Sequence, residues 1–297
     1  MVKYFAVFGD THGPLRLMFR LCQLWQLTTK CFLYGILQCG DLGFFPDHNN
    51  LDKATKRFAL KDPEELGFKY FKKPEPVPID PKLAQILQGF ELGFGNVKAP
   101  VFFCHGNHED FYALQAEVGD ANIKAVDYFD RIHWLRTGYV HPTGGINIAA
   151  VGGGVELSEK KDEEVGLKEL WSSIETDACK KLEKFKFDVL LSHVAPMGIG
   201  GASDNFGSKQ LRKLIEAVKP TYHFYAHHKD IIEPTTIGNT KCYWLNDVNF
   251  CRNSKTMKMP LEKGCMGILS WENDNKHSFE IVEEKWFDEV NFLNWWK

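Results

Sequence analysis

Five short apolar segments of this chain each end in a cluster of polar side chains that are able to bind a metal ion. The segments cover residues 4–8, 32–39, 101–104, 189–191 and 222–226, and the clusters that follow them contain Asp10 and His12, Asp41, Asn107 with His108 and Glu109, His193, and His227 with His228. Short runs of β-branched, aromatic and aliphatic residues are typical of buried strands. The sequence therefore predicts metal-competent side chains at the ends of five strands.

Helical patterns lie between several of these strands. They cover residues 15–25, 82–90 and 170–185, and a fourth follows Ser208, a suitable N-cap for a helix that carries Leu211, Leu214, Ile215 and Val218. Alternation of strands and helices predicts a layered α/β fold, in which ligands bind outside the carboxyl ends of the strands. We therefore expect the five clusters to meet at one site.

The composition is that of an ordinary soluble protein. The chain of 297 residues is 44% hydrophobic and carries a formal net charge of -3, whereas a strongly basic nucleic-acid-binding domain would be positively charged. The first apolar run is too short for a signal peptide, and no segment is long enough to cross a membrane. Eight cysteines without a CxxC pair indicate reduced thiols. We expect a cytoplasmic protein, and a nuclear location fits the same observations.

The residue types in the clusters indicate a transition-metal site. Carboxylate and amide oxygens bind hard divalent cations, whereas imidazole suits manganese, iron, zinc or nickel. A mixed set of Asp, Asn and His therefore favours a divalent transition metal, with manganese preferred, over magnesium alone. The most specific of the motifs is Gly-Asn-His-Glu at residues 106–109, directly after an apolar strand.

The ordered set of motifs resembles that of the calcineurin-like metallophosphoesterases, which is DxH, GD, GNH[ED], a lone His and GHxH. The resemblance implies a four-layer αββα sandwich of two mixed β-sheets flanked by helices, with two metal sites. In that pattern Asp10 and His12 would hold the first metal, Asp41 would bridge both, and Asn107, His193 and His227 would hold the second. His108 would be the histidine that contacts the phosphate and protonates the leaving oxygen. The alternative for His108 is a strand-end histidine partnered by Glu109.

The chemistry that the resemblance implies is hydrolysis of a phosphate ester by a metal-activated hydroxide. Two divalent cations lower the pKa of water and neutralise the negative charge that otherwise protects the ester. Groups that orient the metal-binding imidazoles are expected nearby, and Glu109, Ser192 and Asp230 are candidates from their positions in the sequence.

One position departs from the family pattern. Where the family has the second histidine of GHxH, normally a ligand of the first metal, this chain has Lys229. Three interpretations are open: the first site is weak or empty and relies on Asp10, His12, Asp41 and water; the ammonium replaces the charge of that metal; or a backbone shift lets His228 or Asp230 fill the gap.

Some segments are nearest to the RNA lariat debranching enzymes and their non-catalytic relatives. The similar segments are residues 98–101, 188–193 and 219–227, although those enzymes typically have Cys at the position of Asp10 and keep the final His at that of Lys229. The GDxxDRG motif of the phosphoprotein phosphatases is absent, because Asp41 is followed by Leu, Gly, Phe and Phe. We therefore favour a phosphodiester substrate, with RNA or a nucleotide as its class. The alternative is a catalytically weakened or inactive relative whose cleft binds nucleic acid or a nucleotide.

The chain is expected to form a single domain over residues 1–297. Within it, residues 43–100 form an inserted loop and helix region whose proline-rich part, 73–78, is either a lid or a surface excursion. A hairpin of residues 266–271 and 278–282 closes a sheet. Residues 284–297 form an aromatic tail that docks on the domain or binds a partner. The sequence leaves the oligomeric state open.

Overall fold

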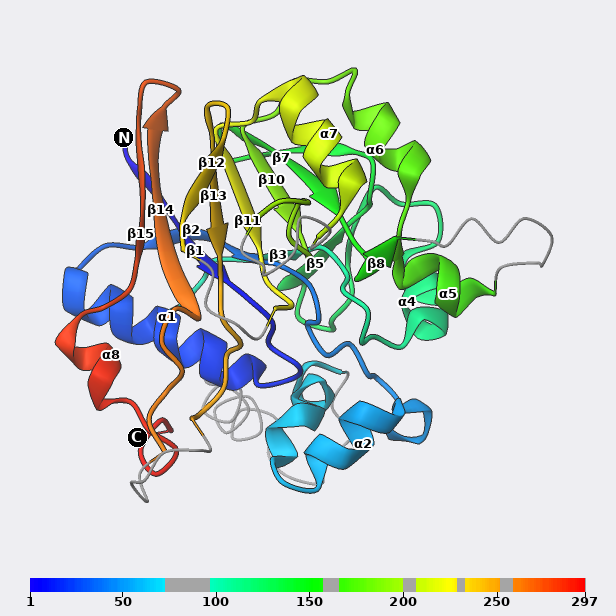
Figure 1. The fold of residues 1–297 in the computed structure, drawn as a ribbon. Helices are drawn as coiled ribbons and strands as arrows, with labels where there is room; N and C mark the ends of the chain where they lie inside the picture. Colours follow the sequence, from blue (N-terminus) through cyan, green and yellow to red (C-terminus); the bar gives the residue numbers. More distant parts are fainter. Residues whose placement is uncertain (73–96, 157–165, 200–206, 229–232, 252–258, 297) are drawn as a thin grey trace.

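Two mixed β-sheets face each other at the centre of the computed structural model, which describes residues 1–72, 97–156, 166–199, 207–228, 233–251 and 259–296 (Figure 1). The seven-stranded sheet has the order β15 (Lys276–Ile281), β14 (Met266–Asn273), β1 (Lys3–Phe8), β2 (Leu33–Gln38), β3 (Val101–Phe103), β5 (Ile132–Leu135), β4 (Ile123–Ala125). The six-stranded sheet has the order β12 (Thr235–Ile237), β13 (Thr240–Trp244), β11 (Tyr222–Tyr225), β10 (Val189–Ser192), β7 (Ile146–Val151), β6 (Val140–Thr143). A separate parallel pair joins β8 (Val155–Glu156) to β9 (Ser173–Ile174).

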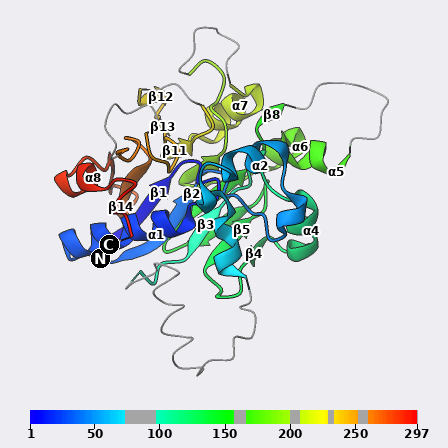
Figure 2. The same ribbon diagram turned by 90° about the horizontal axis from the view of Figure 1, so that it is seen from below.

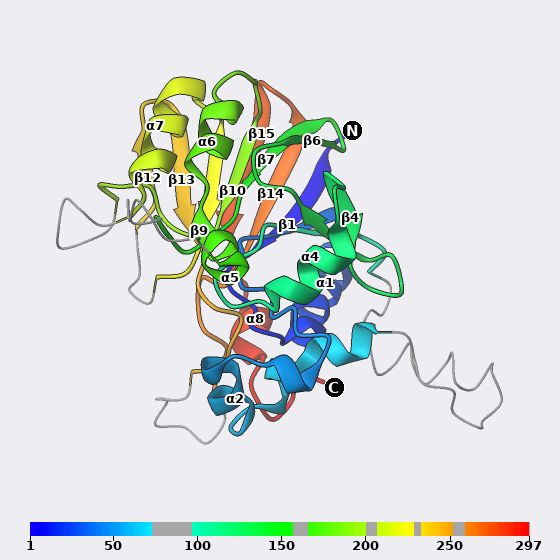
Figure 3. The same cartoon turned by 90° about the vertical axis from the view of Figure 1, so that its right-hand side faces the viewer.

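Helices flank both sheets. They are α1 (Leu15–Thr29), α2 (Lys53–Ala59), α4 (Phe111–Val118), α5 (Leu167–Trp171), α6 (Thr176–Leu182), α7 (Lys209–Val218) and α8 (Lys285–Glu289), with 3₁₀ turns η1 (His48–Asn50) and η2 (Pro63–Phe71). In Figure 3, α6 and α7 lie against one sheet and α1 lies on the far side of the other. Among the described residues, no helix is long and apolar enough to cross a lipid bilayer.

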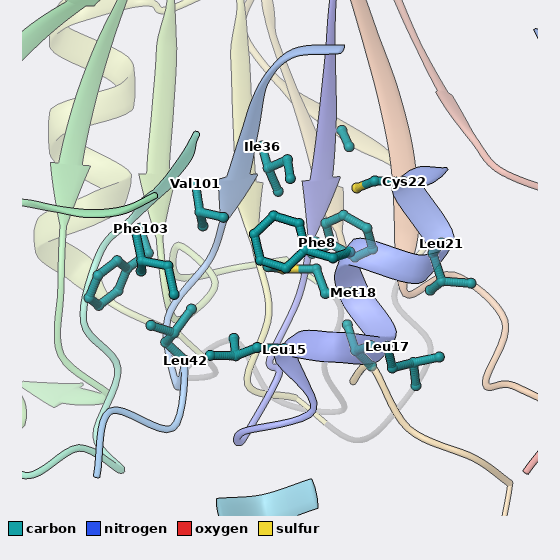
Figure 4. Packing of buried hydrophobic residues seen from close by; sticks show 14 of the residues in the cluster. Phe8, Leu15, Leu17, Met18, Leu21, Cys22, Ile36, Leu42, Val101 and Phe103 are labelled. Carbon is teal, nitrogen blue, oxygen red and sulfur yellow. The ribbon is translucent and has the colours of Figure 1, made fainter. Parts of the chain in front are cut away.

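Three hydrophobic layers hold this sandwich together, and alternation along the strands supplies them. In β1, Phe5 and Val7 point into the layer between the sheets, while Ala6 and Phe8 point to the layer under α1. Figure 4 shows side chains of α1, such as Met18, packed on this outer face of β1 and β2. The third layer joins α6 and α7 to the opposite face of the six-stranded sheet. The predicted four-layer αββα fold is confirmed.

The strands that precede the five clusters are β1, β2, β3, β10 and β11, as the sequence predicts. Pairing is parallel from β1 through β2 to β3, and from β7 through β10 and β11 to β13. The carboxyl ends of these parallel neighbours therefore lie at one edge of each sheet. The hairpin of β14 and β15 is also confirmed.

The helix predictions have mixed outcomes. Helix α1 is confirmed, and Ser208 caps α7 by accepting a hydrogen bond from the Leu211 N–H at 3.2 Å. The prediction of one helix over residues 170–185 is wrong, because β9 interrupts it between α5 and α6. Pairing with β8 takes the backbone of Ser173 and Ile174 out of the helix, and both are weaker helix formers than leucine or lysine. The predicted helix 82–90 and the proline-rich segment 73–78 lie outside the described residues.

Parts of the predicted insertion and tail are also described. Figure 1 shows α2 below the two sheets, and in Figure 2, seen from below, α2 lies in front of the strands. At the other end of the chain, Trp286, Phe292 and Trp295 pack against the layer under α1, whereas Trp296 is exposed. This packing favours docking of the tail on the domain, and the boundaries of both segments stay predictions.

Candidate metal centre

The ends of four strands bring four metal-competent residues to one point. Asp10 follows β1, Asp41 follows β2, His193 follows β10, and His227 follows β11. One potential ligand atom from each of the four lies within 4.8 Å of the others. The two sheets therefore contribute two carboxylates and two imidazoles to a common position, although the residues are up to 217 positions apart in the chain.

Asp41 lies at the centre of this cluster. Its Oδ1 accepts hydrogen bonds from the backbone N–H groups of Asn107 and His108, both at 2.7 Å. Its Oδ2 lies 3.3 Å from His193 Nε2 and 3.9 Å from His12 Nε2. A Cβ at Gly106 would lie 2.1 Å from Oδ1, so the glycine of the Gly-Asn-His-Glu motif allows the backbone to approach this carboxylate.

Three residues of the site adopt left-handed backbone conformations. The φ angles are 48° for His12, 49° for Asp41 and 67° for His227. Non-glycine residues rarely occupy this region, and each instance costs about 1–3 kcal/mol, so such residues concentrate at functional sites. Part of the strain is offset by backbone hydrogen bonds, since Asp41 O accepts from the N–H groups of Thr11 and His12.

Asn107 and His193 complete the interior side of the site. Asn107 Oδ1 lies 2.9 Å from His193 Nε2, and His193 Nδ1 lies 3.3 Å from Asp10 Oδ1. A Cβ at Gly154 would lie 2.5 Å from Asn107 Oδ1, so the backbone of the turn after β7 is in close contact with this amide. The glycines at 152–154 therefore combine a turn, with Gly153 at a φ of 95°, and a close approach to the site.

Electrostatic interactions within the cluster are strong. Burial lowers the pKa of His12, but the carboxylates of Asp41 and Asp10 outweigh that effect and raise the pKa to about 9. Burial likewise disfavours charge on Asp41, yet His193 and His12 hold its pKa well below the ordinary value. His227 behaves in the opposite way, because burial and the neighbouring His193 lower its pKa to about 3. A neutral imidazole next to ionised carboxylates has the protonation states that a cation requires.

The donor set fits a divalent transition metal. Asp10 and Asp41 are almost fully buried, and buried carboxylates are costly unless a cation or several donors compensate for the lost water. Carboxylate oxygen, amide oxygen and imidazole nitrogen together suit first-row transition metals. His12 approaches from the more open side, 3.8 Å from Asp10 Oδ2, with about a third of its side chain exposed.

His108 lies at the rim of the cluster and is held by a residue from the insertion. Its Nδ1 lies 2.7 Å from Oδ2 of Asp52, which also caps α2 through the Thr55 N–H. The hydrogen bond that His108 donates to the Asp52 carboxylate is the largest influence on His108 and raises its pKa. The rings of His12 and His108 are 5.9 Å apart, so His108 faces the same space as the metal-competent residues.

Two candidates for orienting the imidazoles make other contacts. Glu109 is buried and accepts hydrogen bonds from the N–H groups of Leu42 and Phe44, so it supports the loop after Asp41. Ser192 Oγ contacts His223 at 2.7 Å. The alternative in which Glu109 partners His108 does not match these contacts, since His108 Nδ1 contacts Asp52. Asp230 and Lys229 lie outside the described residues.

His228 is one of the residues that could replace the family histidine at the position of Lys229, but its ring contacts the backbone of the six-stranded sheet's neighbouring loop instead. Its Nε2 accepts a hydrogen bond from the Ala195 N–H at 3.1 Å, which leaves that nitrogen unavailable to a metal in this arrangement.

The acidic residues near the site that the sequence analysis missed include Asp52 and Asp247. Asp52 lies in the insertion, where only its helix-capping position gave a signal. Asp247 follows β13 and interacts electrostatically with Asp10 and His12. The apolar segment 242–245 followed by Asn246 and Asp247 repeats the pattern of the five clusters and could have drawn attention to it.

Comparison with known proteins decides the family. A sequence model of the calcineurin-like phosphoesterases matches residues 3–229, which contain all five clusters. The chain belongs to the calcineurin-like phosphoesterase family. Members of this family are hydrolases of phosphate esters that depend on two metal ions, in accord with the gathered ligands at the strand ends of this calcineurin-like phosphoesterase.

The remaining comparisons are less specific. One solved crystal structure aligns with 95% of this chain and 100% of its own, with a TM-score of 0.51 and 12% sequence identity. At that identity the likeness concerns the fold alone. No curated protein sequence matches this calcineurin-like phosphoesterase.

Proposed function

We propose that this chain is a metal-dependent phosphoesterase that prefers phosphodiesters. The observation that carries the proposal is the convergence of Asp10, Asp41, His193 and His227 within 4.8 Å, with His108 at the rim of the same space. Side chains of this kind seldom gather at a buried point without a ligand to hold.

In this proposal each metal ligand keeps the role that the family pattern implies. Asp10 and His12 would hold the first ion, Asp41 would serve both, and Asn107, His193 and His227 would hold the second. When bound, the two ions neutralise charge on the phosphate and make a water molecule acidic enough to supply hydroxide near neutral pH. Manganese is the preferred metal, and iron, zinc or nickel would suit the same donors.

The chain itself supplies the proton for the leaving group. The contact with Asp52 occupies His108 Nδ1, so Nε2 is the nitrogen left to face a phosphate ester. Because the Asp52 carboxylate raises the pKa of His108, the imidazole stays protonated closer to neutral pH and can donate to the departing oxygen. Asp52 acts here as a positioning residue.

The loop after Asp41 supports the preference for diesters. It carries buried apolar side chains, Leu42, Phe44 and Phe45, where a phosphatase motif would supply an arginine to clamp a dianionic monoester. A diester bears a single negative charge and needs less cationic support. RNA or a nucleotide is the proposed class, from the similarity to the lariat debranching enzymes.

The test is manganese-dependent hydrolysis by the wild-type protein and His108→Ala. We expect bis-p-nitrophenyl phosphate to be cleaved faster than p-nitrophenyl phosphate, and His108→Ala to lose most of the activity while it still binds manganese. Equal rates on the two substrates would remove the diester preference. Activity that is unaffected by chelation of metals would overturn the proposal as a whole.

A second candidate is a binding module that holds nucleic acid or a nucleotide without cleaving it. The observation in its favour is Lys229 at a position where the family uses a histidine ligand. It predicts nucleotide binding without turnover by the wild-type protein, and turnover acquired by Lys229→His.

The cytoplasmic location inferred from the sequence stays a prediction.

A further inference from the structure

The loop that follows β13 passes directly beside the first cluster. Strand β13 pairs in parallel with β11, so both strands end at the same edge of the sheet. Beyond them, the Leu245 N–H donates to Tyr225 O at 2.8 Å, and the Val248 N–H donates to Asp10 O at 2.7 Å. Asp247 therefore lies between the end of the six-stranded sheet and the Asp10 segment.

Several contacts fix the position of this loop. A Cβ at Gly9 would lie 2.3 Å from Asn246 O, so the two backbones touch. Asn246 Oδ1 accepts from the Asp247 N–H at 2.9 Å, and its Nδ2 donates to Lys263 O at 3.0 Å. The conformation around Asp247 is thus set by the surrounding backbone.

Asp247 lies within electrostatic range of the charged groups of the site. Asp10, His12, Asp41 and His193 all act on it electrostatically, in accord with the backbone contact between Val248 and Asp10. Among the described residues its carboxylate accepts no hydrogen bond and forms no ion pair. A third acid placed beside Asp10 and Asp41, with no such partner in the part of the chain that the structure describes, adds repulsion that a cation would relieve.

The first metal ion has too few ligands in the proposed assignment, and Asp247 could supply another. In the proposed assignment the first ion has only Asp10, His12 and the shared Asp41, because the remaining family ligand is replaced by Lys229. Metal sites with three protein ligands keep an open position, and a fourth protein oxygen would fill it. Asp247 acts on His12 and Asp10, the two residues proposed for this ion alone.

We infer that Asp247 is a ligand of the first metal ion and supplies the coordination that the family obtains from the histidine at the position of Lys229. The inference rests on the proposed function, since it assumes the two-metal site. With this ligand the first metal site need not be weak or empty. The donor that is absent at Lys229 comes instead from the loop after β13.

The first experiment counts bound manganese. Wild type, Asp247→Ala and a matched control, Asp274→Ala in the exposed turn between β14 and β15, are dialysed against Mn²⁺ and measured by inductively coupled plasma mass spectrometry. We expect two ions per chain for wild type and for the control, and at least tenfold weaker binding of one ion in Asp247→Ala. Unchanged affinity for both ions in Asp247→Ala would overturn the inference and leave the proposed function intact. No bound manganese in wild type would instead count against the proposed function.

The second experiment tests direct ligation and does not depend on activity. Asp247→Cys is titrated with Co²⁺, with wild type as control, because a thiolate that binds cobalt gives a near-ultraviolet charge-transfer band. The band is expected in the variant and absent in wild type, whose eight cysteines lie outside the cluster. A variant that binds cobalt without this band would show that Asp247 does not contact the ion.

Discussion

His193 and His223 are both fully buried, yet they have opposite electrostatic environments. His193 follows β10 and faces Asp41 and Asp10, whose carboxylates outweigh burial and raise its pKa. His223 lies within β11, and burial alone lowers its pKa to about 3. The contrast shows that burial of an imidazole does not mark a metal site. A metal site is instead marked by carboxylates that converge on the imidazole.

His223 instead makes a neutral structural contact. Ser192 Oγ donates to Val194 O, so it accepts from the N–H at His223 Nε2. His105 is similar, since Trp134 Nε1 donates to its Nδ1 and burial lowers its pKa to about 4. These two histidines serve packing, although His105 belongs to the same strand-end cluster as Asn107.

The largest expected effect is that of Asp41→Asn. It removes the charge shared by both proposed metal positions, so hydrolysis should fall on the order of 1,000-fold, or about 4 kcal/mol in transition-state stabilisation. Assays of kcat/KM with Mn²⁺ give the measurement. His223→Gln is the matched control, and it should keep its metal and its activity. Similar losses in both variants would break the distinction between the two regions.

A smaller effect is expected for the pair of His108 and Asp52. His108→Ala should lower kcat about 100-fold through loss of a proton donor, and Asp52→Asn about tenfold through loss of its orientation. Both variants should bind manganese as wild type does. In Asp52→Asn the limb of the pH–rate profile that reports the acid should also move to lower pH, because the carboxylate that raises the pKa of His108 is gone.

The pH dependence of stability provides a third prediction. His223 has a pKa near 6.5 in the unfolded chain and about 3 in the folded protein, so the unfolded state binds more protons between these values. Its contribution to stability is therefore fully present above pH 6.5 and is lost as the pH falls toward 3, by up to about 1.4 kcal/mol per pH unit. Urea denaturation from pH 7 to 4 should show a shallower decline for His223→Gln than for wild type.

The smallest effect on the metal site is expected for Ser192→Ala. It leaves the buried N–H at His223 Nε2 without its acceptor, which should lower the free energy of unfolding by about 1–3 kcal/mol. Manganese affinity should stay within about twofold of wild type. A large loss of metal binding would show that Ser192 does orient His193, and the two regions would then be coupled.

The sequence predicted those features that depend on local pattern. The strands before Asp10, Asp41, Asn107, His193 and His227 follow from short apolar runs, and parallel pairing then brings their ends together. Asp52 could not be predicted as a partner of His108, because only the tertiary position of the insertion creates that contact. Asp247 lacked a neighbouring histidine that would have made its motif specific.

The wrong helix over residues 170–185 has a similar cause. The apolar spacing of Ile174, Ala178 and Leu182 is helical, but the pairing of β9 depends on β8, which lies outside the helical pattern at residues 155–156. Local periodicity carries no information about such a partner.

The central claim is that strand ends from both sheets bind divalent metal at one point. The most direct test is a crystal structure of the protein with Mn²⁺, with diffraction data collected at the manganese absorption edge. We predict anomalous peaks in contact with Asp41 and His193. Peaks only at other positions, with Asp10, Asp41, His193 and His227 clear of metal, would contradict this account.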